Sequence, residues 1–317
     1  MIGSLFEPEP SFDRERLREA LTRLAKENIL IGGSSWKYEG WIGQIYSRSN
    51  YLTRGRFSQK LFEAECLREY VQYFPTVCGD FAFYQFPSDV FWKKLFSQVP
   101  SEFRFAFKVP EQITCKIFPQ HARYGATAGM ANPSFLDAAL LRDAFLRMLE
   151  PYQEKVGVLI FEFGAFSRTS MRDGFEFLEV LDPFLSKLPK TFRYAVEIRN
   201  PEFLMPEYFA CLRSHGAAHV FNAWSKMPEL QTQMALPDSI TANFVVSRAL
   251  LRRGRQYDDA VQLFSPYETI QDPNPEALEA LKKLIHKTRE QRLEAYVYVN
   301  NRLEGNAPQS IMAIVED

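Results

Sequence analysis

Apolar residues follow two alternating periods along this chain. Short apolar runs typical of strands are separated by segments in which apolar residues recur at helical spacing. The predicted strands cover 29–35, 77–84, 103–109, 156–163, 193–201, 218–222, 242–248 and 295–300. The predicted helices cover 13–27, 57–74, 90–96, 133–150, 172–187, 207–215 and 275–292, with a short one after Pro308. Eight strands alternating with helices favour a parallel (β/α)8 TIM-type barrel, with a doubly wound sheet as the alternative.

The predicted amphipathic helix over 13–27 precedes this alternation. Asp13 is a plausible N-cap, and residues 1–12 are expected to form an irregular arm. No shift in composition divides the rest of the chain. We therefore predict an N-terminal arm and helix over 1–28 and one barrel domain over 29–317.

The stretch 193–201 ends in charged residues. Side chains alternate along a strand, so Tyr194, Val196 and Ile198 should share one face and Ala195, Glu197 and Arg199 the other. A carboxylate and a guanidinium at the end of a buried strand are costly unless they pair or bind something. The stretch therefore indicates a site.

Other predicted strands also finish with polar side chains. These residues are Asp80, Tyr84, Lys108, Glu162, Glu197, Arg199, Asn222, Ser247, Arg248, Asn300 and Asn301. Barrels build their active sites at the C-terminal ends of their strands. We therefore expect a polar pocket at the C-terminal mouth of the barrel.

Composition narrows the possible partners. The 317 residues are 46% hydrophobic and 24% charged, with a net charge of −1, so no global attraction to nucleic acid or acidic membranes is expected. Four cysteines without a C-x-x-C pair indicate reduced thiols in a cytoplasmic protein. No apolar run reaches transmembrane length and the N-terminus does not resemble a signal peptide, so no membrane partner is expected.

Several motifs occur together and in order from about Leu30 to the C-terminus. They are Ile31-Gly32-Gly33-Ser34-Ser35-Trp36-Lys37-Tyr38, Phe83-Tyr84 with Pro87-Ser88, Phe103-Arg104-Phe105-Ala106-Phe107-Lys108-Val109-Pro110, Val196-Glu197-Ile198-Arg199-Asn200-Pro201, and Tyr298-Val299-Asn300-Asn301 with Gly305 and Ala307-Pro308. With these motifs the chain resembles the YecE-like family, also called domain of unknown function 72. The resemblance implies a TIM-type barrel and carries no established reaction.

The chain departs from that family's pattern at several strand ends. Cys78 and Asp80 stand where the family usually has a glutamate and an asparagine. Glu162 and Gly164 stand where a glutamine and prolines are common, and Arg248-Ala249-Leu250-Leu251 replaces the usual Arg-x-His-Gly. The barrel is compatible with these changes, but a single chemistry for the whole family is not.

The first functional hypothesis is binding of, or acid/base chemistry on, a small anionic ligand, phosphorylated ligands included. Lys108, Arg199 and Arg248 would hold the anion, since guanidinium groups suit carboxylate or phosphate. The candidate catalytic residues are Glu197, Glu162 and Lys108, and the candidate ligand-binding residues are Tyr84, Arg199, Arg248, Asn300, Asn301 and Trp36. The alternatives are a structural salt-bridge network and glycoside hydrolysis by the two glutamates.

A second hypothesis is a nucleic-acid-binding protein or nuclease. It would use the loop Arg248–Tyr257, which also holds Arg252, Arg253 and Arg255, and the aromatic cluster of Trp36, Tyr38, Trp41 and Tyr46. The same loop could instead face solvent or the acidic helix face near Glu276 and Glu279. A third hypothesis is a non-catalytic protein whose barrel mouth binds a partner.

No metal site is predicted. The four histidines, His121, His215, His219 and His286, share no metal-ligand spacing. A carboxylate site of Asp80, Glu162 and Glu197 would suit Mg²⁺ or Mn²⁺, but nearby Lys108 and Arg199 oppose a cation there. The residues leave open the cofactors, enzymatic activity and oligomeric state.

Overall fold

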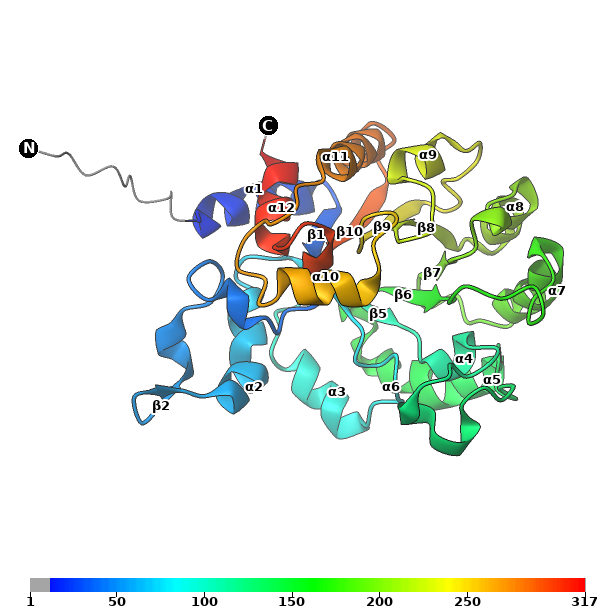
Figure 1. Cartoon of the computed structure of the whole chain (residues 1–317), viewed down its shortest axis with the longest axis horizontal. Coiled ribbons are helices and arrows are strands. Elements are labelled where there is room, and N and C mark those ends of the chain that lie inside the picture. Colours follow the sequence, from blue (N-terminus) through cyan, green and yellow to red (C-terminus); the bar gives the residue numbers. More distant parts are fainter. Residues whose placement is uncertain (1–11, 317) are drawn as a thin grey trace, which may run out of the picture.

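The computed structural model describes residues 12–316 and shows a closed barrel of eight parallel strands surrounded by helices (Figure 1). The strands are β1 Ile29–Gly33, β4 Thr76–Gly79, β5 Arg104–Lys108, β6 Val156–Glu162, β7 Tyr194–Glu197, β8 Ala218–Ala223, β9 Phe244–Ala249 and β10 Glu294–Val299. Each pairs with its sequence neighbour in the barrel, and β10 pairs with β1 to close it. The predicted (β/α)8 barrel is confirmed.

Strand parity places two different sets of side chains on the two faces of the sheet. Ala195 belongs to the small apolar cluster inside the barrel, whereas Tyr194, Val196 and Ile198 join the large cluster between strands and helices. Ala106 likewise faces inward while Phe105 packs outward. The alternation predicted for 193–201 is therefore confirmed, and it directs Glu197 into the barrel.

Helices cover the outside of the barrel. They are α1 Arg14–Lys26, α2 Gln59–Tyr70, α3 Asp89–Phe96, α4 Glu111–Thr114, α5 Ala138–Leu141, α6 Arg147–Leu149, α7 Gly174–Ser186, α8 Pro206–His215, α9 Leu230–Ala235, α10 Tyr257–Phe264, α11 Pro275–Glu290 and α12 Ala307–Val315. A separate two-stranded hairpin pairs β2 Leu52–Thr53 with β3 Arg56–Phe57. The predicted N-terminal helix is α1, capped by Asp13 and lying beside α12 (Figure 1). The predicted arm over 1–12 lies outside the described residues except for Phe12.

Two glycines occupy positions that other residues would not tolerate well. A Cβ on Gly32 would lie 1.9 Å from the carbonyl oxygen of Thr76, so β1 and β4 can approach only with glycine there. Gly216 ends α8 at φ 66°, a left-handed conformation that glycine adopts without a Cβ clash. The chain can then enter β8 directly.

Several sequence predictions differ from the structure. The strand predicted over 193–201 ends at Glu197. The strand predicted over 77–84 ends at Gly79. The helix predicted over 133–150 begins only at Ala138, because the Asp137 side chain accepts from the amides of Ala139 and Leu140, and it contains a π-helical turn over Arg142–Leu146. The basic loop after β9 is also followed by a helix, α10, that the apolar pattern did not predict.

The aromatic residues after β1 form part of the core. Trp41 and Tyr46 are buried and stack on each other, and Trp41 also stacks on Tyr70 of α2. This arrangement anchors the long segment between β1 and α2 to the barrel. In the described range 12–316, no helix combines the length and apolar character needed to cross a membrane.

Candidate functional site

Five charged side chains from four strand ends converge at the C-terminal mouth of the barrel. Lys108 is the last residue of β5, Glu162 the last of β6 and Glu197 the last of β7. Arg199 follows β7 by two residues, and Arg248 lies near the end of β9. Glu162 and Glu197 are paired in register on neighbouring strands. We call these five residues the mouth cluster.

Arg248 joins the two carboxylates of the mouth cluster. Its Nη1 atom lies 2.5 Å from Glu162 Oε2 and 2.5 Å from Glu197 Oε2. Arg199 Nη2 pairs with Glu197 Oε1 and lies 3.3 Å from Glu162 Oε2. Lys108 Nζ completes the cluster at 3.2 Å from Glu162 Oε1. Each carboxylate therefore contacts at least two cations.

The mouth cluster is almost completely removed from solvent. The Glu197 side chain is 0% exposed, and the most exposed member, Glu162, reaches only 16%. Three cations face two carboxylates, so the cluster carries one surplus positive charge. Buried charge of this kind requires full pairing to be tolerated. One further negative charge would balance these five residues. Asp80, an exposed carboxylate directly after β4, is another charge that acts on the nearby Cys78.

The ionisation of Glu162 is set by competing effects. Burial alone would raise the pKa of this carboxyl, but Lys108, Arg199 and Arg248 together hold it well below its usual range. Burial would likewise lower the pKa of Arg248, yet Glu197, Cys78 and Glu162 raise it well above its usual value. Glu162 is therefore a carboxylate at neutral pH, able to accept hydrogen bonds but a weak base and unsuited to donate a proton.

Cys78 of β4 lies inside the barrel near these charges. Burial raises the pKa of its thiol to about 11, although Arg248 and Lys108 act in the opposite direction. It is therefore a neutral thiol at neutral pH and does not add a third anion to the mouth cluster.

Aromatic rings cover two of the cations. Lys108 Nζ lies 3.6 Å from the centre of the Phe83 ring, and the Arg199 guanidinium lies 4.0 Å from the centre of the Trp224 ring. Cation–π contacts of this kind are favourable when the cation is desolvated. Sequence reasoning did not assign Phe83 or Trp224 to the site. Phe83 lies in the loop after β4, and Trp224 directly follows β8. An aromatic residue just after a barrel strand is the sequence feature that could have identified them.

Several buried polar atoms around the mouth have no hydrogen-bond partner in the described range 12–316. They are Arg199 Nη1, Arg248 Nε, Asn222 Oδ1 and Ser34 Oγ. Asn222 Nδ2, by contrast, donates to the carbonyls of Ile198 and Val220, both at 3.3 Å. Buried polar atoms are usually hydrogen-bonded, so unused donors on both arginines are consistent with an unmet ligand contact.

Tyr84 lies farther out than predicted. Because β4 ends at Gly79, Tyr84 falls in the following loop and is 53% exposed. The Arg123 guanidinium lies 4.3 Å from the centre of its ring. Tyr84 and Phe83 both line a cavity of about 310 Å³ together with Glu111 and Arg123. Phe83 therefore contacts Lys108 of the mouth cluster and also this cavity.

Three other predicted ligand-binding residues have structural contacts. Asn301 Oδ1 accepts from Trp41 Nε1 at 3.1 Å and from the amide of Ala307 at 2.7 Å, which fixes the start of α12. Asn300 Oδ1 accepts from the amide of Arg302. Trp36 packs edge-on against Phe81 and lines a separate cavity between α2 and α3. These contacts do not join the three residues to the mouth cluster.

Ser247 also differs from the expectation for strand-end polar residues. It is adjacent to Arg248 on β9, so alternation turns its side chain away from the barrel interior. Its hydroxyl donates to the carbonyl of Phe221 at 3.1 Å. It therefore supports β8 and does not take part in the mouth cluster.

The arginine loop after β9 is held by an aspartate. Arg252 Nη1 lies 3.0 Å from Asp272 Oδ2, and Arg255 Nη2 pairs with the same oxygen. The partner is therefore Asp272, and not the helix face near Glu276 and Glu279. Arg253 is exposed. Asp272 therefore balances one of the two arginine charges that it contacts, and both arginine side chains are held against the protein.

The family model described as protein of unknown function DUF72 matches residues 30–317. The chain belongs to the DUF72 family. It is similar to the crystal structure of a DUF72 family protein from Enterococcus faecalis V583, at 19% identity and a TM-score of 0.59, covering 90% of this chain and 94% of that chain. A DUF72 family protein from Thermotoga maritima MSB8 gives 19% identity and a TM-score of 0.57, covering 90% and 96%. No curated protein matches this chain.

These comparisons confirm the family resemblance and the TIM-type barrel. At such low identity, the similarity to the two DUF72 structures shows the fold alone. Function therefore has to be argued from this chain's own mouth cluster.

Proposed function

We propose that this DUF72 protein binds a small anionic ligand, phosphorylated ligands included, at the C-terminal mouth of its barrel. The surplus positive charge of the mouth cluster is the observation that carries the proposal. A ligand with one or more negative charges would neutralise it. The unused donors Arg199 Nη1 and Arg248 Nε would supply the hydrogen bonds that fix the anion.

A purely structural salt-bridge network would explain the ion pairs, but it would not explain why cations outnumber carboxylates. A purely structural cluster would be expected to balance its charges, because each unpaired buried charge is destabilising. Here the third cation has no matching carboxylate within the cluster. Replacing such a network with apolar residues is often neutral or stabilising, so stability alone gives no reason for these five charges.

Acid/base chemistry forms the second part of the proposal. Glu197 would act as the proton acceptor, whereas the low pKa of Glu162 keeps it ionised but makes it a weak base, better suited to hold the cations in place. Lys108 would stabilise negative charge on the ligand. Glycoside hydrolysis is less consistent with this arrangement, because it needs one carboxyl group that is protonated before reaction. Arg248 Nη1 also lies 2.5 Å from both carboxylates, where a sugar would have to enter.

A thermal-shift panel would test the binding proposal. Purified protein would be mixed with phosphorylated metabolites, carboxylic acids, neutral sugars, divalent metals and short DNA and RNA oligonucleotides. A ligand at 100 times its dissociation constant stabilises a protein by about 2.7 kcal/mol. We expect at least one small anion to raise the melting temperature of the wild type.

Two matched arginine variants identify the binding place. Arg199→Ala removes a buried mouth cation, whereas Arg193→Ala removes an arginine at the opposite end of the barrel. The proposal predicts that the anion shift is lost in the first variant and kept in the second. Arg199→Lys, which keeps the charge but loses the planar fork, serves if Arg199→Ala fails to fold. Equal shifts in all variants would refute binding at the mouth.

The nucleic-acid hypothesis is one outcome of the same panel. It would be supported by a shift from oligonucleotides alone that disappears with added salt. Asp272 holds Arg252 and Arg255 in place, which leaves Arg253 as the exposed arginine of this loop to contact a phosphate backbone. A cytoplasmic location remains part of our proposal, supported by the four free cysteines.

A further inference from the structure

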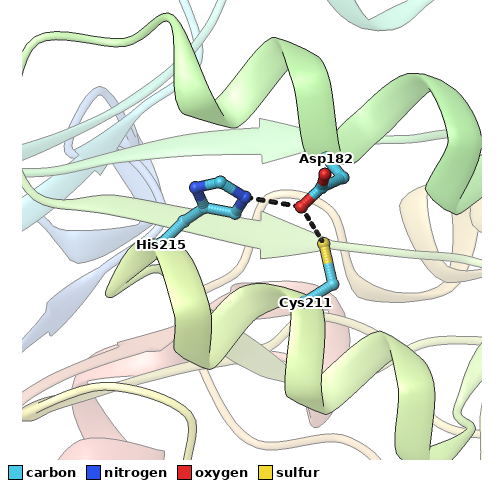
Figure 2. A group of neighbouring side chains, drawn as sticks. All are labelled: Asp182, Cys211 and His215. Carbon is cyan, nitrogen blue, oxygen red and sulfur yellow. Dashed lines mark hydrogen bonds and ion pairs between the residues drawn. The ribbon is translucent and has the colours of Figure 1, made fainter.

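Two neighbouring outer helices bring together a carboxylate, a thiol and an imidazole. Figure 2 shows Asp182 on α7 directed toward Cys211 and His215 on α8. The three side chains can each offer one metal-ligating atom, and these atoms all lie within 4.8 Å of one another. Among residues 12–316 this is the group of histidine, cysteine and acidic side chains that is compact enough to hold a metal ion.

The sequence spacing accounts for the arrangement. Cys211 and His215 are four residues apart on α8, so they share one face of the helix. Packing of α7 against α8 brings Asp182 opposite that face. The spacing between histidines alone does not reveal this set, because its other two members are a cysteine and an aspartate.

From these positions we propose that Asp182, Cys211 and His215 form a binding site for Zn²⁺ or a divalent metal ion of similar preference. Thiolate, imidazole and carboxylate are ligands that zinc accepts together. Three protein ligands leave one tetrahedral position for water. The Asp182 side chain is 59% exposed, so water can reach the site.

The distances fit a tetrahedral ion with little rearrangement. Tetrahedral zinc with bonds of about 2.0–2.3 Å separates its ligand atoms by roughly 3.4–3.6 Å. Here His215 Nε2 lies 2.7 Å from Asp182 Oδ1, and Cys211 Sγ lies 3.7 Å from the same oxygen. The hydrogen-bonded N–O pair at 2.7 Å must open by about 0.7 Å, which the exposed Asp182 side chain allows.

Helix polarity favours a cation at this place. His215 is the last residue of α8, and Asp182 lies near the end of α7, so the partially negative C-termini of both helices converge here. Lys190 Nζ already donates to the carbonyl of His215 at 3.1 Å, which reduces but does not remove this effect. The site lies at the opposite end of the strands from the mouth cluster, so it is independent of the proposed anion site.

Metal binding requires a proton to leave Cys211. Burial, with Asp182 nearby, raises the pKa of this thiol to about 12 in the metal-free protein. A bound cation reverses that balance, so the thiol proton is released to solvent as the metal–sulfur bond forms. The affinity should therefore rise with pH, and the bound ion would link α7 to α8.

Cobalt substitution provides the most specific test. Full-length protein treated with a chelator would be titrated with Co²⁺, whose coordination by thiolate gives a charge-transfer absorption band. We expect this band at one equivalent in the wild type and its loss in Cys211→Ser. Cys115→Ser is the matched control, since Cys115 is also partly buried but only donates to the carbonyl of Ile117. It should keep the band.

Zn²⁺ competition and stability supply a second readout. Zn²⁺ should displace Co²⁺ and raise the melting temperature of the wild type, and this shift should be lost in His215→Gln and reduced in Asp182→Asn. Circular dichroism would establish that each variant is folded. A cobalt spectrum without the thiolate band, equal binding by Cys211→Ser, or no binding by the wild type would overturn the proposal and leave an ordinary His–Asp ion pair.

Discussion

The ion pairs at the two ends of the barrel differ in how far they are buried. At the N-terminal ends of the strands, Arg193 Nη2 lies 2.9 Å from Glu294 Oε2, with side chains 46% and 24% exposed. At the mouth, Arg199 pairs with Glu197, with side chains 5% and 0% exposed. Ion pairs near solvent contribute little to stability, whereas a buried charge that loses its partner is strongly destabilising. The same residue types are therefore replaceable at one end and tightly constrained at the other.

The two ends of the barrel also differ in the balance between cations and carboxylates. Glu294 also accepts from Tyr296 at 2.6 Å, so its pairing is completed by a neutral donor and solvent. The mouth cluster instead carries three cations for two carboxylates and still leaves arginine donors unused. We infer that the N-terminal pair supports structure and that the mouth is organised for an anion.

The largest expected difference is between Arg248→Ala and Arg193→Ala. Removing Arg248 takes away the cation that contacts both buried carboxylates, so we expect a loss of about 3–5 kcal/mol in the free energy of unfolding. Removing the exposed Arg193 should cost about 1 kcal/mol or less. Urea unfolding at neutral pH would measure both. Similar losses for the two variants would remove the distinction between the ends.

The next prediction concerns how the ionisation of Glu162 makes the stability of the protein depend on pH. Its folded pKa is held below the unfolded value, so its ionisation contributes stability that is present above about pH 4.5 and lost as pH falls. In that acidic range the unfolded chain binds more protons, and stability therefore rises with pH.

Glu162→Gln should lower stability by about 3 kcal/mol at pH 7 and flatten the acidic part of the stability curve. Urea unfolding between pH 7 and pH 3 would compare it with the wild type. An unchanged slope in the variant would show that the cations do not hold Glu162 in its ionised form.

The smallest of these effects separates structural from ligand-binding residues. Asn301→Ala leaves Trp41 Nε1 and the Ala307 amide without their acceptor, and we expect a loss of about 2 kcal/mol. Because neither contact involves a residue of the mouth cluster, the affinity for the anion should stay the same. Binding titrations would check this, and a large loss of affinity would return Asn301 to the ligand site.

Local alternation explains how much of the site could be predicted. Lys108 and Glu197 are placed by the parity of a strand, and the same alternation continues to Arg199 just after β7. This alternation depends only on neighbours along the chain. The barrel then brings these strand ends together because all its strands run parallel. These two rules account for the mouth cluster without any knowledge of distances.

Contacts between distant segments could not be predicted in the same way. The role of Asn301 depends on Trp41, 260 residues away, and that of Arg252 on Asp272 across a loop. Tyr84 was misplaced because an apolar run continued past the point where β4 stops pairing. The helix start at Ala138 depended on the Asp137 cap, which competed with the proline signal at Pro133.

The most direct test of the central claim is a crystal structure with the best anion from the thermal-shift panel. The account predicts density for the anion within hydrogen-bond distance of Arg199 and Arg248, with the ion pairs of Glu162 or Glu197 rearranged around it. Density beside Arg253 in the loop after β9, or a mouth cluster unchanged from the present arrangement, would contradict an anion site at the barrel mouth.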